Sequence, residues 1–411
     1  MAEETNKIAV LRSEQMARKT YEELKKIMEQ ENVSRIWSWS KFNCFKTSPF
    51  EYYLKYIKHA EEDRQDCIYT STGSLAHDII EKFYTGKIKY EDMIGEFEDG
   101  WITLYNIAQL KFDRNNEEKN NSIGEKYYLN LKHFFENHTV LKYKPILEQF
   151  VKVKIGNHLF HGYLDCCFKD DDDVYHIIDW KTSTVYKGDK AKKECGQLVM
   201  YLLSLVEAGV PIEKIKIAWN FLKYCTVQYE QANGEVKTRD IERFELGEKL
   251  QANLKVWLKK LGYKDQMDEY LKMVVDTNSI ECLPEDVQAK YKISDCYVYV
   301  DVTEDLINYW KDDIITTIKD IALREKDYDE TNSENVWWDT DESVKAQSYY
   351  FSTLCGYSGN LHKPYGEYLK RLEAAKNGED MFSGVGGVAT KSSNVIENKK
   401  DEVDLSWLNN I

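Results

Sequence analysis

The sequence predicts an α/β protein in which a mixed β-sheet core is flanked by helices and interrupted by helical insertions. Apolar residues recur at helical spacing before Pro145, and after it they alternate in the way that strands require. A helical segment at 191–208 separates three such strands from a further strand at 214–229. Strands, a helix and another strand in this order indicate the α/β class.

The N-terminal part is expected to be helical. Apolar residues within 13–31 follow helical spacing and predict a first helix. Pro49 predicts the start of a second helix, because proline is favoured in the first turn. A third helix is expected to open after Gly73, and it carries His77 among apolar neighbours. The pattern of residues 87–143 predicts a helical arm without a chemical motif.

Turn residues separate the strands that follow Pro145, and an Asn-Gly hairpin turn comes after the later strand. The expected strands span 147–155, 159–168, 174–181 and 214–229, with a short strand at 297–301. The expected later helices span 244–261 and 303–324. The sheet nucleus therefore lies in the middle of the chain.

We expect five parts along the sequence. They are N-terminal helices at 1–86, a helical arm at 87–145, the sheet core at 146–232, a C-terminal helical region that completes the domain at 233–375, and a flexible tail at 376–411. The tail is rich in Gly, Ser, Asn and charged residues, so it cannot bury enough apolar surface to fold by itself.

Composition excludes several classes of protein. Hydrophobic residues make up 42% of the 411 residues and only 5 are Pro, which excludes collagen-like and wholly disordered chains. Nine cysteines, an odd number without tight pairing, argue against a secreted disulfide framework. The acidic start MAEETNKIAV is unlike a signal peptide, and no apolar run approaches the roughly 18 residues of a membrane span. We therefore expect a cytoplasmic protein with no membrane partner.

The turn at 170–173 brings two aspartates together. If the turn is symmetric about residue 172, residues equally far from it face each other, and Asp165 then faces Asp179. Opposite side chains in an antiparallel pair lie about 4.5–5.5 Å apart, and like charges there destabilise the pair unless something neutralises them. A divalent cation would do so, which makes the pair a candidate metal site.

Lys181 adds an ammonium group to this pair, because alternation along the strand places it on the same face as Asp179. Two carboxylates that hold a hard cation, with a lysine that orients or deprotonates a water, are what metal-assisted phosphodiester hydrolysis requires. The alternative is a hairpin whose acids face solvent or pair with lysines. Residues 170–173 are interpreted in that way, as a turn, because they lack the spacing of an EF-hand.

An ordered set of motifs extends over much of the chain. It consists of Ser38 and Ser40; Pro49 with Tyr52 and Tyr53; Gly73 with His77; Glu148; Gly162 with Asp165; Asp179, Trp180, Lys181 and Thr182; and Gln197 with Tyr201. In its order and spacing this set resembles the PD-(D/E)XK nuclease superfamily, in particular its RecB-like exonuclease branch, which includes AddB and the CRISPR-associated RecB-like exonucleases. The resemblance implies a restriction-endonuclease-like fold. It covers Ser38 to Tyr229 and resumes faintly near 352–368.

The resemblance implies roles for the residues that match the metal motifs. His77, Asp165 and Asp179 would bind a divalent metal, Mg²⁺ or Mn²⁺, together with the main-chain carbonyl of Trp180. Lys181 would position the attacking water. An isolated histidine on an apolar helix is more often a core residue, so His77 gains its role from the set and not by itself.

Glu148 is the weaker candidate, for a second metal or a water-mediated ligand. Gln197 and Tyr201 lie one helical turn apart and share a face, where the resemblance places them near the DNA phosphates and the lysine. Thr182 belongs to the same substrate-binding group. Taken alone, Gln197 and Tyr201 would be an ordinary amphipathic pair.

One departure from the branch concerns iron. Many RecB-like nucleases hold an iron–sulfur cluster with one cysteine just before the motif proline and three near the C-terminus. Here Ser48 precedes Pro49, and the segment near 352–368 keeps only Cys355. Because a cluster usually needs about four thiolates, we expect none, with packing around Cys355 in its place.

These residues predict a Mg²⁺- or Mn²⁺-dependent DNA nuclease, and we expect an exonuclease of recombination, repair or replication. The net charge of −15 argues against bulk coating of nucleic acid but allows local contact around a metal. No Walker A sequence occurs, so any ATP-driven unwinding must come from a partner. The alternative is a catalytically silent DNA-binding or scaffold subunit.

The end of the tail carries a group of apolar residues, Leu405, Trp407, Leu408 and Ile411. One hypothesis is that Leu405, Trp407 and Leu408 dock on a replication or recombination protein at the end of a flexible tether. The alternative is a frayed terminus or a tip that folds back on the body.

Overall fold

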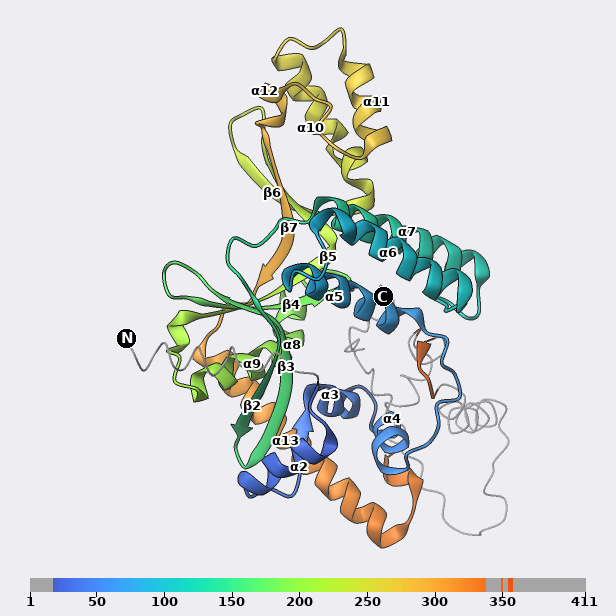
Figure 1. Ribbon diagram of the computed structural model, residues 1–411, viewed down its shortest axis with the longest axis vertical. Coiled ribbons are helices and arrows are strands. Elements are labelled where there is room, and N and C mark those ends of the chain that lie inside the picture. Colours follow the sequence, from blue (N-terminus) through green and yellow to red (C-terminus); the bar gives the residue numbers. More distant parts are fainter. Residues whose placement is uncertain (1–17, 338–348, 350–353, 358–411) are drawn as a thin grey trace, which may run out of the picture. The chain divides into compact units, whose positions relative to one another are not determined.

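The computed structural model describes residues 18–337, 349 and 354–357 of the chain (Figure 1). They fall into two compact units. Unit 1 takes its residues from 1–39, 68–112 and 116–316, and unit 2 from 40–67, 113–115 and 317–411. The predicted tail and its apolar tip lie outside the described residues. Within the described part, no helix is both long and apolar enough to cross a membrane.

Unit 1 is built on a mixed sheet that has seven strands among the described residues. The strands are β1 (Ile36–Ser38), β2 (Ile146–Ile155), β3 (His158–Lys169), β4 (Tyr175–Lys181), β5 (Ile215–Glu230), β6 (Val236–Glu242) and β7 (Tyr291–Tyr299). Their order is β1-β3-β4-β5-β6, with β2 also paired to β3 and β7 to β5. The β1–β3 and β4–β5 pairs are parallel and the others antiparallel. This is the predicted mixed α/β class, consistent with a restriction-endonuclease-like core.

β5 joins two parts of the sheet. Its first half pairs with β4 and its second half with β6, while β7 pairs along its other edge. The register with β7 shifts between Asn220 and Cys225. Beyond this irregularity, the sheet continues as a β6-β5-β7 extension.

Two of the apolar cores in the described part of unit 1 join helices to the sheet. Helices α5 (Ile68–Tyr84), α6 (Met93–Trp101) and α7 (Glu117–Asn137) share one core with the middle of the sheet. The other core joins the β6-β5-β7 extension to α10 (Leu246–Lys260), α11 (Met267–Thr277) and α12 (Glu285–Gln288), which lie together at one end of β6 and β7 (Figure 1). Helix α9 (Gly196–Glu207), preceded by α8 (Asp189–Glu194), lies against β2, β4 and β5.

The alternation of β4 decides where its polar residues point. Ile178 and Trp180 belong to the core that α5 shares. Because successive side chains of a strand face opposite sides, Asp179 and Lys181 face away from that core. The paired residues of β5 are Trp219 beside Asp179 and Phe221 beside Lys181.

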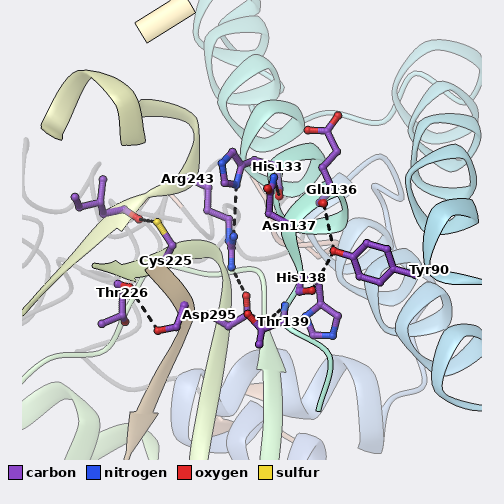
Figure 2. Close-up of polar contacts among 12 residues, drawn as sticks. Tyr90, His133, Glu136, Asn137, His138, Thr139, Cys225, Thr226, Arg243 and Asp295 are labelled. Carbon is purple, nitrogen blue, oxygen red and sulfur yellow. Dashed lines mark hydrogen bonds and ion pairs between the residues drawn. The ribbon is translucent and has the colours of Figure 1, made fainter. Parts of the chain in front are cut away.

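A buried polar network fastens α7 to the sheet (Figure 2). His138, just after α7, donates from Nδ1 to Asp295 Oδ2 of β7 over 2.9 Å. Arg243 donates from Nη2 to Asp295 Oδ1 over 2.5 Å and from Nη1 to His133 Nδ1 over 3.5 Å. Tyr90 donates to the main-chain carbonyl of His138 over 3.0 Å. Since His138, Arg243 and Asp295 are all buried, the carboxylate depends on both partners for its stability.

The remaining elements are α-helices, π segments and 3₁₀ turns. They are α2 (Tyr21–Gln30), α3 (Trp39–Thr47), α4 (Pro49–Tyr52), α13 (Glu304–Thr331), the π segments Tyr53–Ile57 and Ile102–Ile107, and the 3₁₀ turns Tyr90–Asp92, Ile212–Lys214, Arg243–Glu245 and Glu334–Trp337. In unit 2, Ser48 caps α4 by accepting a hydrogen bond from the Glu51 amide over 3.0 Å. Cys355 is buried, and its carbonyl accepts from Arg114 Nη1 over 3.1 Å.

The strands predicted after Pro145 are confirmed as β2, β3 and β4, and the later strand as β5. The start of α5 is a correction, because the helix begins at Ile68 and not after Gly73. Ile68 and Thr72 are fully buried, and Thr72 Oγ1 donates to the Ile68 carbonyl over 3.0 Å. Core packing therefore stabilises an additional turn of helix at the start of α5. The polar Ser-Thr-Gly segment in this turn does not favour a helix, so the sequence pattern did not predict it.

Other elements differ from the prediction in length. β7 begins at Tyr291, well before the expected short strand at 297–301. Its buried charge at Asp295 hides the alternation of the strand, and only its partners elsewhere in the sequence make that burial possible. The helix expected at 191–208 is divided at Cys195 into α8 and α9, and α13 continues to Thr331.

Candidate active site

The β3–β4 hairpin has the register that the symmetric turn predicts. Cys166 pairs with Ile178 and Cys167 with Ile177. Continued by one residue, this register sets Asp165 of β3 opposite Asp179 of β4. The ladder itself ends at Cys166, and the main-chain N–H of Trp180 instead donates to Asp165 Oδ2 over 3.1 Å.

Glu148 of β2 lies on the other side of Asp165. Leu147 pairs with Cys166 and Gln149 with Leu164, so Glu148 is level with Asp165 between these pairs. The backbone of Glu148 has φ of +46°, in the left-handed region that costs a non-glycine residue free energy. Three carboxylates, on β2, β3 and β4, therefore occupy one level of the sheet.

His77 reaches this level from α5. One ligand atom from each of His77, Glu148 and Asp165 lies within 4.8 Å of the other two. The Nδ1 atom of His77 is 3.7 Å from Asp165 Oδ2, and its Nε2 atom donates to the Trp180 carbonyl over 2.9 Å. The ring also packs edge-on against the Trp180 indole. The main-chain N–H and the main-chain carbonyl of Trp180 therefore both take part in the cluster.

Lys181 pairs with the buried member of the carboxylates. Its Nζ atom lies 2.7 Å from Asp179 Oδ2, and the Asp179 side chain is only 2% exposed against 29% for Lys181. Burial disfavours a charged ammonium, but Asp179 and Asp165 more than compensate and raise the pKa of Lys181. Beside these carboxylates the lysine is a protonated counter-ion.

Two of the carboxyl groups have raised pKa values. Burial and the charges of Asp179 and Glu148 raise the pKa of Asp165 to about 7, against the opposing charges of His77 and Lys181. Burial also raises the pKa of Glu148, while Arg18 and His77 oppose that shift. A raised carboxyl pKa means that the ionised form is poorly compensated, and a cation at this point would compensate it.

Gln197 and Tyr201 lie on α9, as predicted. Gln197 Nε2 donates to Tyr201 Oη over 3.0 Å. Tyr201 is buried, and burial together with the charges of Asp165 and Asp179 raises its pKa. Its ring fills the space beside Gly162, because a Cβ atom there would lie 2.6 Å from Tyr201 Cε1. Glycine is thus required on β3 for Tyr201 to sit close to the carboxylates.

Some of the remaining motif residues belong to the unit that holds this cluster, and others belong to unit 2. A Cβ atom added to Gly73 of α5 would meet Thr182 Oγ1 at 3.7 Å, so these two motif positions are neighbours. Ser38 pairs with His161 at the end of β1. Ser40 and Pro49, with Tyr52 and Tyr53, belong to unit 2 and not to the unit that holds the carboxylates.

Two residues near the carboxylates were missed by sequence reasoning. Arg18 is exposed, and its guanidinium lies 5.8 Å from the centre of the Tyr163 ring. Tyr186 follows β4 and packs edge-on against Trp219 with ring centroids 5.0 Å apart. Burial raises the pKa of Tyr186, and the Lys181 ammonium opposes that shift. Neither residue belongs to a sequence motif, because Arg18 is a single arginine before a helix and Tyr186 a single tyrosine in a loop. Only the fold could therefore identify them as neighbours of the carboxylates.

The donor atoms fit a hard divalent cation. Carboxylate and carbonyl oxygens suit Mg²⁺ and Mn²⁺, and one imidazole is compatible with Mn²⁺. Neighbouring ligands of an octahedral ion at about 2.1 Å lie about 3 Å apart. His77 Nε2 and the Trp180 carbonyl show such a separation, at 2.9 Å, with a proton between them.

Comparison with known families identifies a nuclease superfamily. A family model described as the PD-(D/E)XK nuclease superfamily matches residues 36–290, which is more than half of the chain and includes His77, Glu148, Asp165, Asp179 and Lys181. No curated protein matches the chain. The chain belongs to the PD-(D/E)XK nuclease superfamily.

Proposed function

We propose that the protein is a metal-dependent deoxyribonuclease that hydrolyses DNA phosphodiester bonds. Membership of the superfamily implies a metal-dependent nuclease. The observation that carries the proposal is the row of carboxylates Glu148, Asp165 and Asp179 beside Lys181, where the charges of Glu148 and Asp179 raise the pKa of Asp165. A carboxylate whose ionised form is poorly stabilised by the protein itself is expected where a cation binds.

Asp165, Asp179, His77 and the Trp180 carbonyl would hold Mg²⁺ or Mn²⁺. Glu148 joins this proposed set because its carboxylate lies within 4.8 Å of the donor atoms of His77 and Asp165. When bound, the ion supplies Lewis-acid stabilisation of the charge on the phosphate. The Trp180 N–H holds Asp165 in place by a hydrogen bond of 3.1 Å.

Lys181 would orient the attacking water. Its ammonium is held at 2.7 Å from Asp179, so it would present its remaining N–H groups to a water or to a phosphate oxygen. A cation that took up the charge of Asp179 would remove part of the interaction that raises the pKa of Lys181, so the ammonium would release its proton more readily and could then serve as a base.

Gln197, Tyr201 and Thr182 would contact the DNA on the phosphate side of the site. Gln197 already donates to Tyr201, so the hydroxyl of Tyr201 retains its own proton for a phosphate oxygen. The RecB-like resemblance favours an exonuclease of recombination, repair or replication in the cytoplasm. It also favours a separate partner for unwinding, since the sequence contains no Walker A motif.

The competing function is a silent DNA-binding or scaffold subunit. The intact Asp165, Asp179 and Lys181 argue against it, because a subunit that only holds DNA has no need of a buried carboxylate next to another. The two functions differ in one measurable property, which is cleavage.

The test is cleavage of end-labelled single- and double-stranded DNA with Mg²⁺, with Mn²⁺ or with EDTA. We expect cleavage with a divalent cation and none with EDTA. Circular DNA of the same sequence separates exonuclease from endonuclease, since an exonuclease needs an end. Binding of DNA without cleavage in either metal would favour the scaffold function.

A further inference from the structure

An arginine stands beside the carboxylates on the side of β2. Arg18 is exposed, and its guanidinium carbon lies 5.8 Å from the centre of the Tyr163 ring, within the range of a cation–π contact. Tyr163 is two residues before Asp165 on β3 and pairs with Phe150. At about 3.3 Å per residue, this aromatic pair is some 7 Å along the sheet from the level of Glu148 and Asp165.

The segment that carries Arg18 is fixed at several points. The main-chain N–H of Lys19 donates to Tyr163 Oη over 2.5 Å, and the Lys19 ammonium lies 5.1 Å from the Phe150 ring centre. Thr20 then caps α2 by accepting from the Glu23 amide over 3.3 Å, while Glu23 accepts from the Thr20 amide over 2.7 Å. Arg18 is therefore anchored immediately before a capped helix.

Among the described residues, Arg18 has a cation–π contact with Tyr163 but no ion pair. No described acidic side chain forms an ion pair with it. Its planar guanidinium thus keeps N–H donors available for another anion.

We propose that Arg18, held on the ring of Tyr163, binds a DNA phosphate that neighbours the one being cleaved. This assignment rests on the proposed function. An exposed guanidinium is the side chain best suited to a phosphate, because it offers parallel donors. In a chain of net charge −15 with several acids at its centre, a cation beside them also lowers the repulsion that an incoming strand meets.

Three variants test the contact in an Asp179→Asn background, in which bound DNA should stay intact. Arg18→Gln removes the charge, Arg18→Lys keeps it without the planar group, and Arg239→Gln removes an exposed charge from β6 as a control. The affinity for a fluorescent single-stranded oligonucleotide is measured by anisotropy in Mg²⁺ over a range of salt concentrations. Thermal unfolding of each variant shows whether it is folded.

We expect Arg18→Gln to bind about tenfold more weakly at low salt, as for the loss of a charge-assisted hydrogen bond. The slope of log affinity against log salt should fall by about 0.7, which is the value for one phosphate contact on a single strand. Arg18→Lys should keep the slope and lose part of the affinity. Arg239→Gln should match its parent.

An unchanged slope and affinity in a folded Arg18→Gln protein would overturn the phosphate contact. If the protein with native Asp179 still cleaves DNA, the nuclease assignment survives that result. Conversely, a native protein that binds with an Arg18-dependent slope but cleaves nothing would overturn the proposed function and leave the contact intact. A purely structural role of Arg18 would lower the unfolding temperature and leave the salt slope unchanged.

Discussion

The main-chain N–H of Trp180 donates a hydrogen bond of 3.1 Å to the carboxylate of Asp165. The carbonyl of the same residue accepts from His77 Nε2 over 2.9 Å. One residue of β4 thus ties a side chain of β3 and a side chain of α5 to the position between Asp179 and Lys181. Because these contacts use the main chain, changing the acids or the lysine leaves the link from Trp180 to His77 in place.

The first prediction concerns these side chains. Asp165→Asn, Asp179→Asn and Lys181→Ala should each lower the rate of DNA cleavage by at least about 100-fold, the lower range for removal of a group that acts in proton transfer or charge stabilisation. Each variant should remain folded by circular dichroism. The matched control is Asp172→Asn, an exposed acid in the turn of the same hairpin. Cleavage near the native rate by Asp179→Asn would refute the site assignment.

The rules for turns and for strand alternation predicted the register of the β3–β4 hairpin. The turn at 170–173 and the alternation on either side of it fix the register, so the position of Asp165 opposite Asp179 could be predicted from sequence. The same rules could not predict the left-handed backbone of Glu148 or its closeness to His77, because both depend on how β2 and α5 meet at β3. For that reason the sequence ranked Glu148 below the other ligands.

The second prediction follows from the raised pKa of Asp165. Its pKa is about 7 in the folded protein and 3.8 ordinarily. As the pH rises from about 4 to about 7, the unfolded chain releases this proton first, so the contribution of Asp165 to stability falls over that window. The unfolding free energy of Asp165→Asn, which stays neutral, should therefore rise relative to that of the native protein as the pH increases. In EDTA, this difference between the two proteins should be larger at pH 8 than at pH 5 by at least about 1 kcal/mol.

Urea unfolding at both pH values measures this difference, with Asp172→Asn as the control. Adding Mn²⁺ at pH 8 should raise the unfolding temperature of the native protein more than that of Asp165→Asn. An equal difference between the two proteins at both pH values would show that Asp165 ionises as an ordinary carboxyl.

The third prediction concerns the space beside Tyr201. Gly162→Ala places a Cβ atom 2.6 Å from Tyr201 Cε1 and 3.2 Å from Met200 Cε, so the tyrosine must move. We expect a loss of about 1–3 kcal/mol in unfolding free energy, the range for overpacking, and slower cleavage. Gly73→Ala is the control, since its Cβ meets nothing closer than 3.7 Å and alanine favours the helix. Equal behaviour of the two variants would contradict the close fit.

The fourth prediction addresses the network that joins α7 to β7. Burial disfavours the ionised carboxyl, but His138 and Arg243 lower the pKa of Asp295. Asp295→Ala should cost about 3–5 kcal/mol in urea unfolding, because it leaves a buried guanidinium without its partner. The double variant Arg243→Met with Asp295→Leu should recover much of that loss. Asp171→Asn, at an exposed ion pair with Lys142, should change stability little.

This network also shows a limit of sequence reasoning. His138, Arg243 and Asp295 come from separate parts of the chain and follow no motif. A charged residue in the middle of a segment argues against a buried strand until its partners are known, and β7 begins six residues before the expected strand at 297–301. Apolar periodicity predicts elements, whereas buried polar pairs depend on tertiary contacts.

The last prediction separates the two consequences of Glu148, its carboxylate and its strained backbone. Glu148→Ala and Glu148→Gly both remove the carboxylate, so both should weaken Mn²⁺ binding, measured by calorimetry, to a similar extent. Only glycine relieves the backbone at φ of +46°. The glycine variant should therefore be more stable than the alanine variant by about 1 kcal/mol in urea unfolding with EDTA, because a left-handed conformation costs other residues about that much. Equal stabilities would show that the backbone carries no strain, and native Mn²⁺ affinity in both variants would remove Glu148 from the metal site. Strain that persists at a ligand position is stabilised by the surrounding fold, and here it turns the third carboxylate toward His77 and Asp165.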